Sequence, residues 1–298
     1  MKKTINFLIL CFFCFVLFNI FIHNYFVKET IFLAVNIWLN KLVPNLMPLF
    51  LISPFLLNYG FAYYISIPFK KIFKILFNCN EIGVYVFFLS MISGFPSSAK
   101  YITDLYENNL IDENTATKLL TFTHFTNPLF ILGFIKAIVG LKWALIILIT
   151  HYSTNIIIGL IFRNMSPYID KKINVESKSF SIILKEAIDK TYTTLITILE
   201  TIIFFMIIIK IIKLPPIFAY FSNMFLEMTN GILYVSNLNT VFKPLFITMI
   251  ISFGGICVHF QVLSIISNTK IKYQPYLLAR LLHALIAGII IYIINILV

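Results

Sequence analysis

Charged residues are scarce in this chain of 298 residues: only 12% are Asp, Glu, Lys or Arg, while 60% are hydrophobic. A soluble domain carries roughly 25% charged residues. The low charge and the mean hydropathy of +0.94 therefore exclude an ordinary soluble protein. Several apolar runs approach the roughly 20 residues that cross a bilayer as a helix. The sequence predicts a multi-pass membrane protein that is embedded in the lipid bilayer.

Three further absences narrow the class of protein. Alternating apolar and polar stretches, as found in membrane barrels, are missing, so we expect an all-α fold. The four cysteines are few, and the pair Cys11 and Cys14 lies inside the first apolar run, where packing explains it better than a metal or a disulfide. Neither H-E-x-x-H nor G-x-x-x-x-G-K occurs. We therefore expect no enzyme, no metal and no cofactor.

The basic residues give a net charge of +11 and stand in short groups beside apolar runs. This placement favours contact with anionic headgroups over nucleic-acid binding, which we do not expect. Lys2 and Lys3 precede the first apolar run, and no small-x-small cleavage site follows it. Residues 1–28 are therefore predicted to form a retained transmembrane helix, with a cytoplasmic N-terminus in the cell membrane.

The remaining chain divides into two halves that look related. Residues 29–162 form the first half, residues 163–190 a charged linker, and residues 191–298 the second half. Pro44, Pro48 and Pro54 predict a kinked or broken helix early in the first half. Each half also contains an apolar run interrupted by glycine. Interrupted hydrophobic segments at matching positions indicate a binding site in transporters built from repeats.

The first interruption is "SGFPSSAK", residues 93–100, at the end of an uncharged run. Gly94 permits unusual backbone angles, and Pro96 cannot donate a helix hydrogen bond. Ser97 or Ser98 is expected to cap a new half-helix whose amides, together with Lys100, attract an anionic or hydrogen-bonding ligand. The alternative is a re-entrant turn in which Lys100 only reaches the headgroups.

The second interruption is "SFGGICVHFQ", in which Gly254 and Gly255 precede His259 and Gln261. Two polar side chains just beyond a glycine pair predict a place on a solute pathway, although helix packing is the alternative. Asn127 stands before Pro128 at the start of another apolar run, which predicts a helix cap. We add Asn127 to the candidate binding residues.

Glu200 is the most informative single charge, because nine uncharged residues flank it on each side. A carboxylate near the centre of a span costs about 2.5–3.5 kcal/mol on insertion scales. It therefore needs a partner, a proton or a water-filled cavity, and Lys100 and Arg280 are the candidate partners. A buried ion pair that holds helices together and a role in proton or ion coupling both remain open.

Together these motifs resemble the sporulation integral membrane proteins of the YlbJ type, which are related to nucleoside-recognition (Gate) domains. The resemblance covers residues from about 40 to the end and is carried by the matching positions Gly94, Pro96, Ala99, Lys100, Asn127, Pro128, Leu129, Phe130, Phe253, Gly254, Gly255, Val258 and Gln261. Ser98 departs from the family pattern, which has a second glycine there. The resemblance implies a multi-pass protein of the cell membrane that acts in endospore formation.

The leading hypothesis is a transporter-like protein of sporulation, whose two broken-helix repeats form a polar site for a small polar or nucleoside-like solute. The alternative is a membrane scaffold or assembly factor for the spore envelope that transports nothing. A third and weaker hypothesis, an intramembrane hydrolase using Ser97 or Ser98, lacks a nucleophile turn such as G-x-S-x-G. Homo-oligomers or other sporulation membrane proteins are the expected partners.

Overall fold

The computed structural model describes residues 2–167, 178–211 and 216–297, and these residues form helices without any strand. The prediction of an all-α membrane fold is confirmed. In chain order the helices are α1 (Lys2–Ile22), α2 (Asn24–Ile37), η1 (Trp38–Leu42), α3 (Val43–Asn58), α4 (Phe61–Ser66), α5 (Lys70–Phe77), α6 (Glu81–Ser93), α7 (Ser97–Glu107), α8 (Glu113–Phe122), α9 (Pro128–Phe130), η2 (Ile131–Ile135), α10 (Lys136–Ile161), η3 (Arg163–Met165), α11 (Phe180–Ile211), α12 (Pro216–Phe225), α13 (Met228–Ser236), α14 (Lys243–Phe253), α15 (Gly255–Ile266) and α16 (Tyr273–Leu297).

Five continuous or nearly continuous helical stretches among the described residues are long and apolar enough to cross a membrane. They are Thr4–Ile22, Pro128–Met165, Phe180–Ile211, Lys243–Ile266 and Tyr273–Leu297. Two bent pairs, Asn24–Asn40 with Val43–Asn58 and Lys70–Phe77 with Ile82–Ser93, raise the number to seven if each is one span. The chain is therefore an integral membrane protein with several apolar helices.

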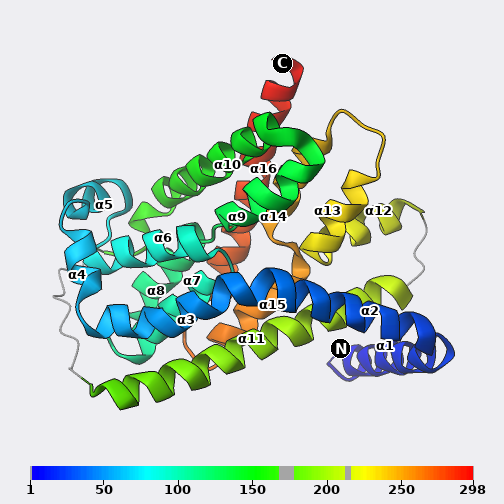
Figure 1. Ribbon diagram of the computed structural model, residues 1–298, viewed down its shortest axis with the longest axis horizontal. Helices are drawn as coiled ribbons and strands as arrows, with labels where there is room; N and C mark the ends of the chain where they lie inside the picture. The colour runs from blue at the N-terminus through cyan, green and yellow to red at the C-terminus, as the bar shows by residue number, and fades with distance from the viewer. Residues whose placement is uncertain (1, 168–177, 212–215, 298) are drawn as a thin grey trace.

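The N-terminal helices lie along one side of the molecule. α2 and α3 pack against α11, and Figure 1 shows these blue helices running beside the yellow-green α11. The predicted break is present at the start of α3: a π-helical turn precedes the helix, Pro44 lies in its first turn, and the two segments meet at 50°. Pro48 and Pro54 lie inside the helix beyond this bend. α1 is almost entirely exposed, as expected of a helix that faces lipid.

The other side is built around the C-terminal helix α16, which packs against α14, α10 and α8 (Figure 1). The core positions of α16 carry small or polar side chains, including Ala279, Arg280, His283 and Gly288. Small residues let neighbouring helices approach closely in a membrane protein, and polar ones hydrogen-bond across the interface. α16 therefore supplies much of the polar interior described below.

The charged linker predicted over residues 163–190 overlaps α11, which begins at Phe180. Residues 178 and 179 precede the helix, and residues 168–177, with Lys171 and Lys172, lie outside the described residues. The helical start is consistent with the apolar residues that return at Phe180. The division into two related halves stays a prediction.

Candidate functional site

The first break separates α6 from α7 at Gly94, whose φ of +78° lies in the region that favours glycine. A Cβ at this position would lie 2.6 Å from the backbone nitrogen of Asn127, so the close approach also requires glycine. α7 begins at Ser97, and the preceding Pro96 provides no side-chain cap. The prediction that Ser97 or Ser98 caps this helix is therefore wrong, because both serines already lie inside its first turn.

Asn127 holds the open end of the first break. Its side-chain nitrogen donates to the carbonyl oxygens of Ile92 and Ser93 at 3.1 and 3.3 Å. Its side-chain oxygen accepts from the backbone nitrogen of Leu129 at 2.7 Å, which confirms the predicted cap at the start of α9. One amide therefore satisfies the last carbonyls of α6 and the first donor of α9.

The second break lies between α14 and α15, where Gly254 and Gly255 have φ values of +92° and +73°. His259 closes it: the nitrogen Nε2 lies 3.1 Å from the carbonyl oxygen of Phe253, and Nδ1 lies 2.8 Å from the hydroxyl of Tyr273. A carbonyl only accepts, so Nε2 carries a proton, whereas the hydroxyl of Tyr273 can either donate to Nδ1 or accept from it. His259 therefore satisfies the carbonyl at the end of α14.

The two breaks meet at His124, a fully buried residue in the connection between α8 and α9. On one side the ring of Phe95, from the first break, stacks on His124 with the centroids 4.6 Å apart and the planes at 4°. On the other side a Cβ at Gly254, in the second break, would lie 3.2 Å from Nε2 of His124. The hydroxyl of Tyr276 lies 3.2 Å from Nδ1. One histidine therefore joins both breaks to α16.

Behind His124 lies a buried polar cluster from α10 and α16. His151 accepts from the backbone nitrogen of Thr126 at 3.0 Å through Nε2, so it is neutral, and its Nδ1 lies 3.4 Å from the hydroxyl of Ser252. His283 donates from Nε2 to the carbonyl oxygen of His151 at 3.0 Å. Within the described residues no three His, Cys, Asp or Glu side chains are placed to hold a metal ion. The cluster is a hydrogen-bonded interior between helices.

Arg280 is completely buried within this cluster. Its guanidinium donates to the carbonyl oxygens of Thr121 at 2.6 Å and His124 at 3.3 Å, and to the side-chain oxygen of Asn155 at 3.2 Å. Thr121 lies in the last turn of α8, where unpaired carbonyls and the helix dipole favour a cation. Arg280 therefore neutralises a helix end, and no carboxylate contacts it among the described residues.

Glu200 lies apart from both of its candidate partners. It is exposed on α11, and the structure pairs Lys100 with Asp104 and Arg280 with carbonyl oxygens instead. The proposed ion pairs of Glu200 are therefore not formed. Gln261 lies on α15, where it donates to the sulfur of Cys257 at 3.4 Å. Of the candidate residues, Gly254 and Arg280 lie against His124. Gly94 lies against Asn127, Lys100 pairs with Asp104, and Gln261 bonds to Cys257.

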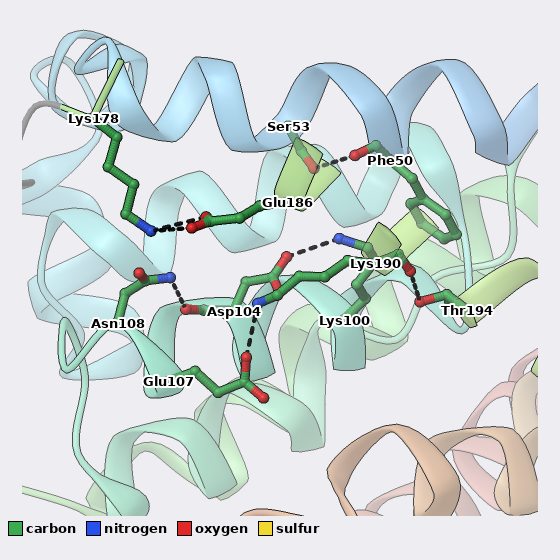
Figure 2. Close-up of polar contacts among 10 residues, drawn as sticks. All are labelled: Phe50, Ser53, Lys100, Asp104, Glu107, Asn108, Lys178, Glu186, Lys190 and Thr194. Atoms are coloured by element: carbon green, nitrogen blue, oxygen red, sulfur yellow. Dashed lines mark hydrogen bonds and ion pairs between the residues drawn. The ribbon is translucent and has the colours of Figure 1, made fainter. Parts of the chain in front are cut away.

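Lys100 belongs to an ion network that joins α7 to α11 (Figure 2). Its ammonium lies 2.8 Å from one oxygen of Asp104, and the ammonium of Lys190 lies 2.7 Å from the other oxygen and 2.7 Å from Glu107. Lys100 also lies over the ring of Phe50, 5.5 Å from its centroid. Burial raises the pKa of Asp104, but the two ammonium groups outweigh burial, so that its pKa is lowered.

Sequence reasoning missed His124, Asp104 and Lys190 as members of these sites. Asp104 stands four residues after Lys100, which is the spacing of a helical ion pair, so a local signal was present. His151 and His283 each lie inside an apolar run. Intramembrane ionisable residues indicate a polar interior, so these two histidines also carried a signal.

The chain matches no known protein-family profile, and no solved structure matches it. It is similar to the sporulation integral membrane protein YlbJ of Bacillus subtilis (strain 168), with 25% identity over an alignment of 337 positions, gaps included. The match covers 97% of this chain and 82% of that relative. The similarity therefore spans nearly the whole chain. The chain is a homologue of this sporulation integral membrane protein, as the motifs around Gly94, Asn127 and Gly254 predicted.

Proposed function

We propose that this protein is a transporter-like membrane protein of sporulation, which handles a small polar solute at the place where its two helix breaks meet. It acts without enzymatic chemistry in the cell membrane, with its N-terminus in the cytoplasm. Homology to YlbJ supports a role in sporulation. The transport role rests on the arrangement of the breaks, and a nucleoside-like solute is one candidate.

The single observation that carries the proposal is the position of His124 between Phe95 and Gly254. Irregular backbone at membrane depth is tolerated only where protein or a water-filled cavity satisfies it. In transporters built from repeats, such broken helices come together at the substrate site. Two helix breaks that contact one buried histidine match this arrangement. Two kinks that served only local folding would not need to contact the same residue.

A small cavity of about 50 Å³ lies beside the first break. Its lining includes Phe95, Thr126 and Asn127 from the break and Met228 from the start of α13. The volume holds a water molecule or two but no solute of useful size. A transporter with this structure is therefore in a closed state, and its breaks must separate to admit a solute.

The test replaces His124 and Tyr276 together with phenylalanine, by exchange of the chromosomal copy in the spore-forming host. His124→Phe alone leaves the hydroxyl of Tyr276 unpaired, which costs about 1–3 kcal/mol. The pair His124→Phe and Tyr276→Phe removes both partners and keeps the ring contact with Phe95, so the free energy of unfolding returns close to that of the wild type.

The proposal expects the double variant to be stable but to yield few heat-resistant spores at an unchanged level of protein in the membrane. Full spore yield from the stable double variant contradicts it, because the polar groups then serve packing only. Tyr85→Phe is the matched control, since it removes another buried tyrosine hydroxyl, one that donates to the carbonyl oxygen of Ser53 in α3.

One observation favours the alternative of a scaffold for the spore envelope: Asn127 and His259 both satisfy helix ends, which is a structural task. In a scaffold the breaks matter for folding alone, and exposed segments carry the function. Replacing residues 168–177 by an unrelated polar sequence of equal length then abolishes spore formation. A transporter tolerates this exchange.

A further inference from the structure

A second candidate site lies away from the breaks, in a cavity of about 420 Å³ between α7, α11 and the end of α15. Its lining includes Thr193 and Thr197 of α11, Thr103 of α7, and Asn268 just after α15. The volume lies within the range of small-molecule sites in proteins. The ion network of Lys100, Asp104, Lys190 and Glu107 forms part of its wall (Figure 2).

Most threonine hydroxyl groups that line this cavity already donate a hydrogen bond to a backbone carbonyl oxygen of their own helix. The hydroxyl of Thr193 donates to the carbonyl oxygen of Asp189 at 2.9 Å, that of Thr194 to Lys190 at 2.8 Å, and that of Thr197 to Thr193 at 2.9 Å. A hydroxyl that donates within its own helix offers only lone pairs to a ligand. The threonine stripe therefore presents acceptors to the cavity.

The charged side chains of the wall also favour a positively charged ligand. Three carboxylates, those of Asp104, Glu107 and Asp189, face two ammonium groups, those of Lys100 and Lys190, which gives a net charge of −1 within a chain of net charge +11. Both ammonium groups already donate to carboxylates. The last turn of α15 also lines the cavity, and the C-terminal end of a helix carries partial negative charge.

Thr103 carries a buried and unpaired hydroxyl at the wall of the cavity. Its side chain is 8% exposed and lines the cavity, yet its hydroxyl oxygen has no hydrogen-bond partner among the described residues. Buried polar groups are nearly always satisfied by protein, water or ligand. The hydroxyl oxygen itself is buried, so Thr103 adds to the wall an unpaired polar group that can either donate or accept a hydrogen bond.

We propose that this cavity is a binding site for small organic cations of the ammonium or guanidinium class, and that it disfavours anions of the same size. Such cations bring donors and positive charge to a wall of acceptors with net negative charge. The site is separate from the helix breaks, and the proposal holds whether or not the breaks form a transport site.

The test measures how fast a cysteine in the cavity reacts with two reagents of similar size and opposite charge. The exposed Cys11 and Cys14 are replaced by serine, whereas Cys79 and Cys257 are buried and remain. Thr197→Cys places the reporter in the cavity, and Lys185→Cys places a control at an exposed position of the same helix. The full chain, purified in detergent at low ionic strength, is treated with a trimethylammonioethyl and a sulfonatoethyl methanethiosulfonate.

We expect the ratio of cation rate to anion rate to be about tenfold higher at Thr197→Cys than at Lys185→Cys. The difference shrinks in 0.5 M sodium chloride, because salt screens the charges of the wall. Tetramethylammonium chloride is expected to slow the reaction of Thr197→Cys with a neutral maleimide, and sodium acetate at the same concentration is not.

Three results overturn the proposal: equal ratios at the two positions, a preference for the anionic reagent at Thr197→Cys, or no reaction there at all. Protection by acetate but not by tetramethylammonium also overturns it. None of these measurements depends on spore formation. Failure here is therefore distinguishable from failure of the proposed site at the breaks.

Discussion

The ion network between α7 and α11 gives the sharpest test of the structure. We predict that Asp104→Asn destabilises the protein far more than Glu107→Gln, although both changes turn a carboxylate of α7 into an amide and both remove a partner of Lys190. The difference arises from burial. Asp104 and Lys100 are 16% and 3% exposed, whereas Glu107 and Lys190 are 46% and 37% exposed.

The expected magnitudes follow from these exposures. Removing one partner of a buried ion pair costs about 3–5 kcal/mol, because the other charge stays buried without a counter-ion. Asparagine keeps an acceptor for Lys100, so we expect a loss of about 2–3 kcal/mol for Asp104→Asn. An exposed pair contributes at most about 1 kcal/mol, which is the limit for Glu107→Gln.

The assay is reversible unfolding of the purified protein in mixed micelles, followed by the change in free energy of unfolding for each variant. A second substitution sharpens it: Lys100→Met added to Asp104→Asn removes the stranded charge and recovers most of the loss. Equal effects of Asp104→Asn and Glu107→Gln refute the buried pair, and so does a double variant that is no more stable than Asp104→Asn.

The structure also predicts how the stability difference between wild type and Asp104→Asn changes with pH. The pKa of Asp104 is lowered below its usual value of about 3.9. Its ionised form therefore stabilises the fold above that value, and this contribution is lost as the pH falls through the folded-state pKa. The stability difference between wild type and Asp104→Asn is constant at neutral pH and shrinks only below about pH 4.

Three further substitutions are measured by the same unfolding assay: Gly94→Ala at the first break, Gly133→Ala as its control, and Arg280→Met. Gly94→Ala is expected to cost at least about 2 kcal/mol, because of its positive φ and the backbone of Asn127, whereas Gly133→Ala, with open space around it, is neutral or stabilising by up to about 1 kcal/mol. Arg280→Met is expected to cost about 3 kcal/mol or more, since the carbonyl oxygens of Thr121 and His124 lose their donor. A neutral Arg280→Met refutes the capping role of this arginine.

Local signals in the sequence predicted the elements well. Gly94 and Gly254 mark the two breaks because a positive φ is readily adopted only by glycine, and Asn127 caps its helix because the cap and the following proline are adjacent in sequence. Asp112 likewise accepts from the backbone nitrogen of Thr115 at the start of α8. Each of these features is decided within a few residues.

Contacts between residues far apart in the sequence could not be predicted from such local signals. Glu200 drew attention because its neighbours are uncharged, yet which charge meets which depends on how α7 and α11 pack. Arg280 needed no carboxylate, because the end of α8 supplies carbonyl oxygens that its position in the sequence does not reveal. His124 stands beside a predicted cap, and its place between the two breaks follows only from tertiary structure.

α7 physically connects the two proposed sites. It begins at Ser97 beside the first break and carries Asp104 seven residues later, about 10 Å along the helix. A cation in the cavity is expected to compete with Lys190 for Asp104 and Glu107, and thereby to weaken the ion pairs that join α7 to α11. The bonds that hold the first break come instead from Phe125 and Asn127 and are untouched. Cation binding therefore loosens α11 first, and the break follows only if α7 moves as a rigid helix.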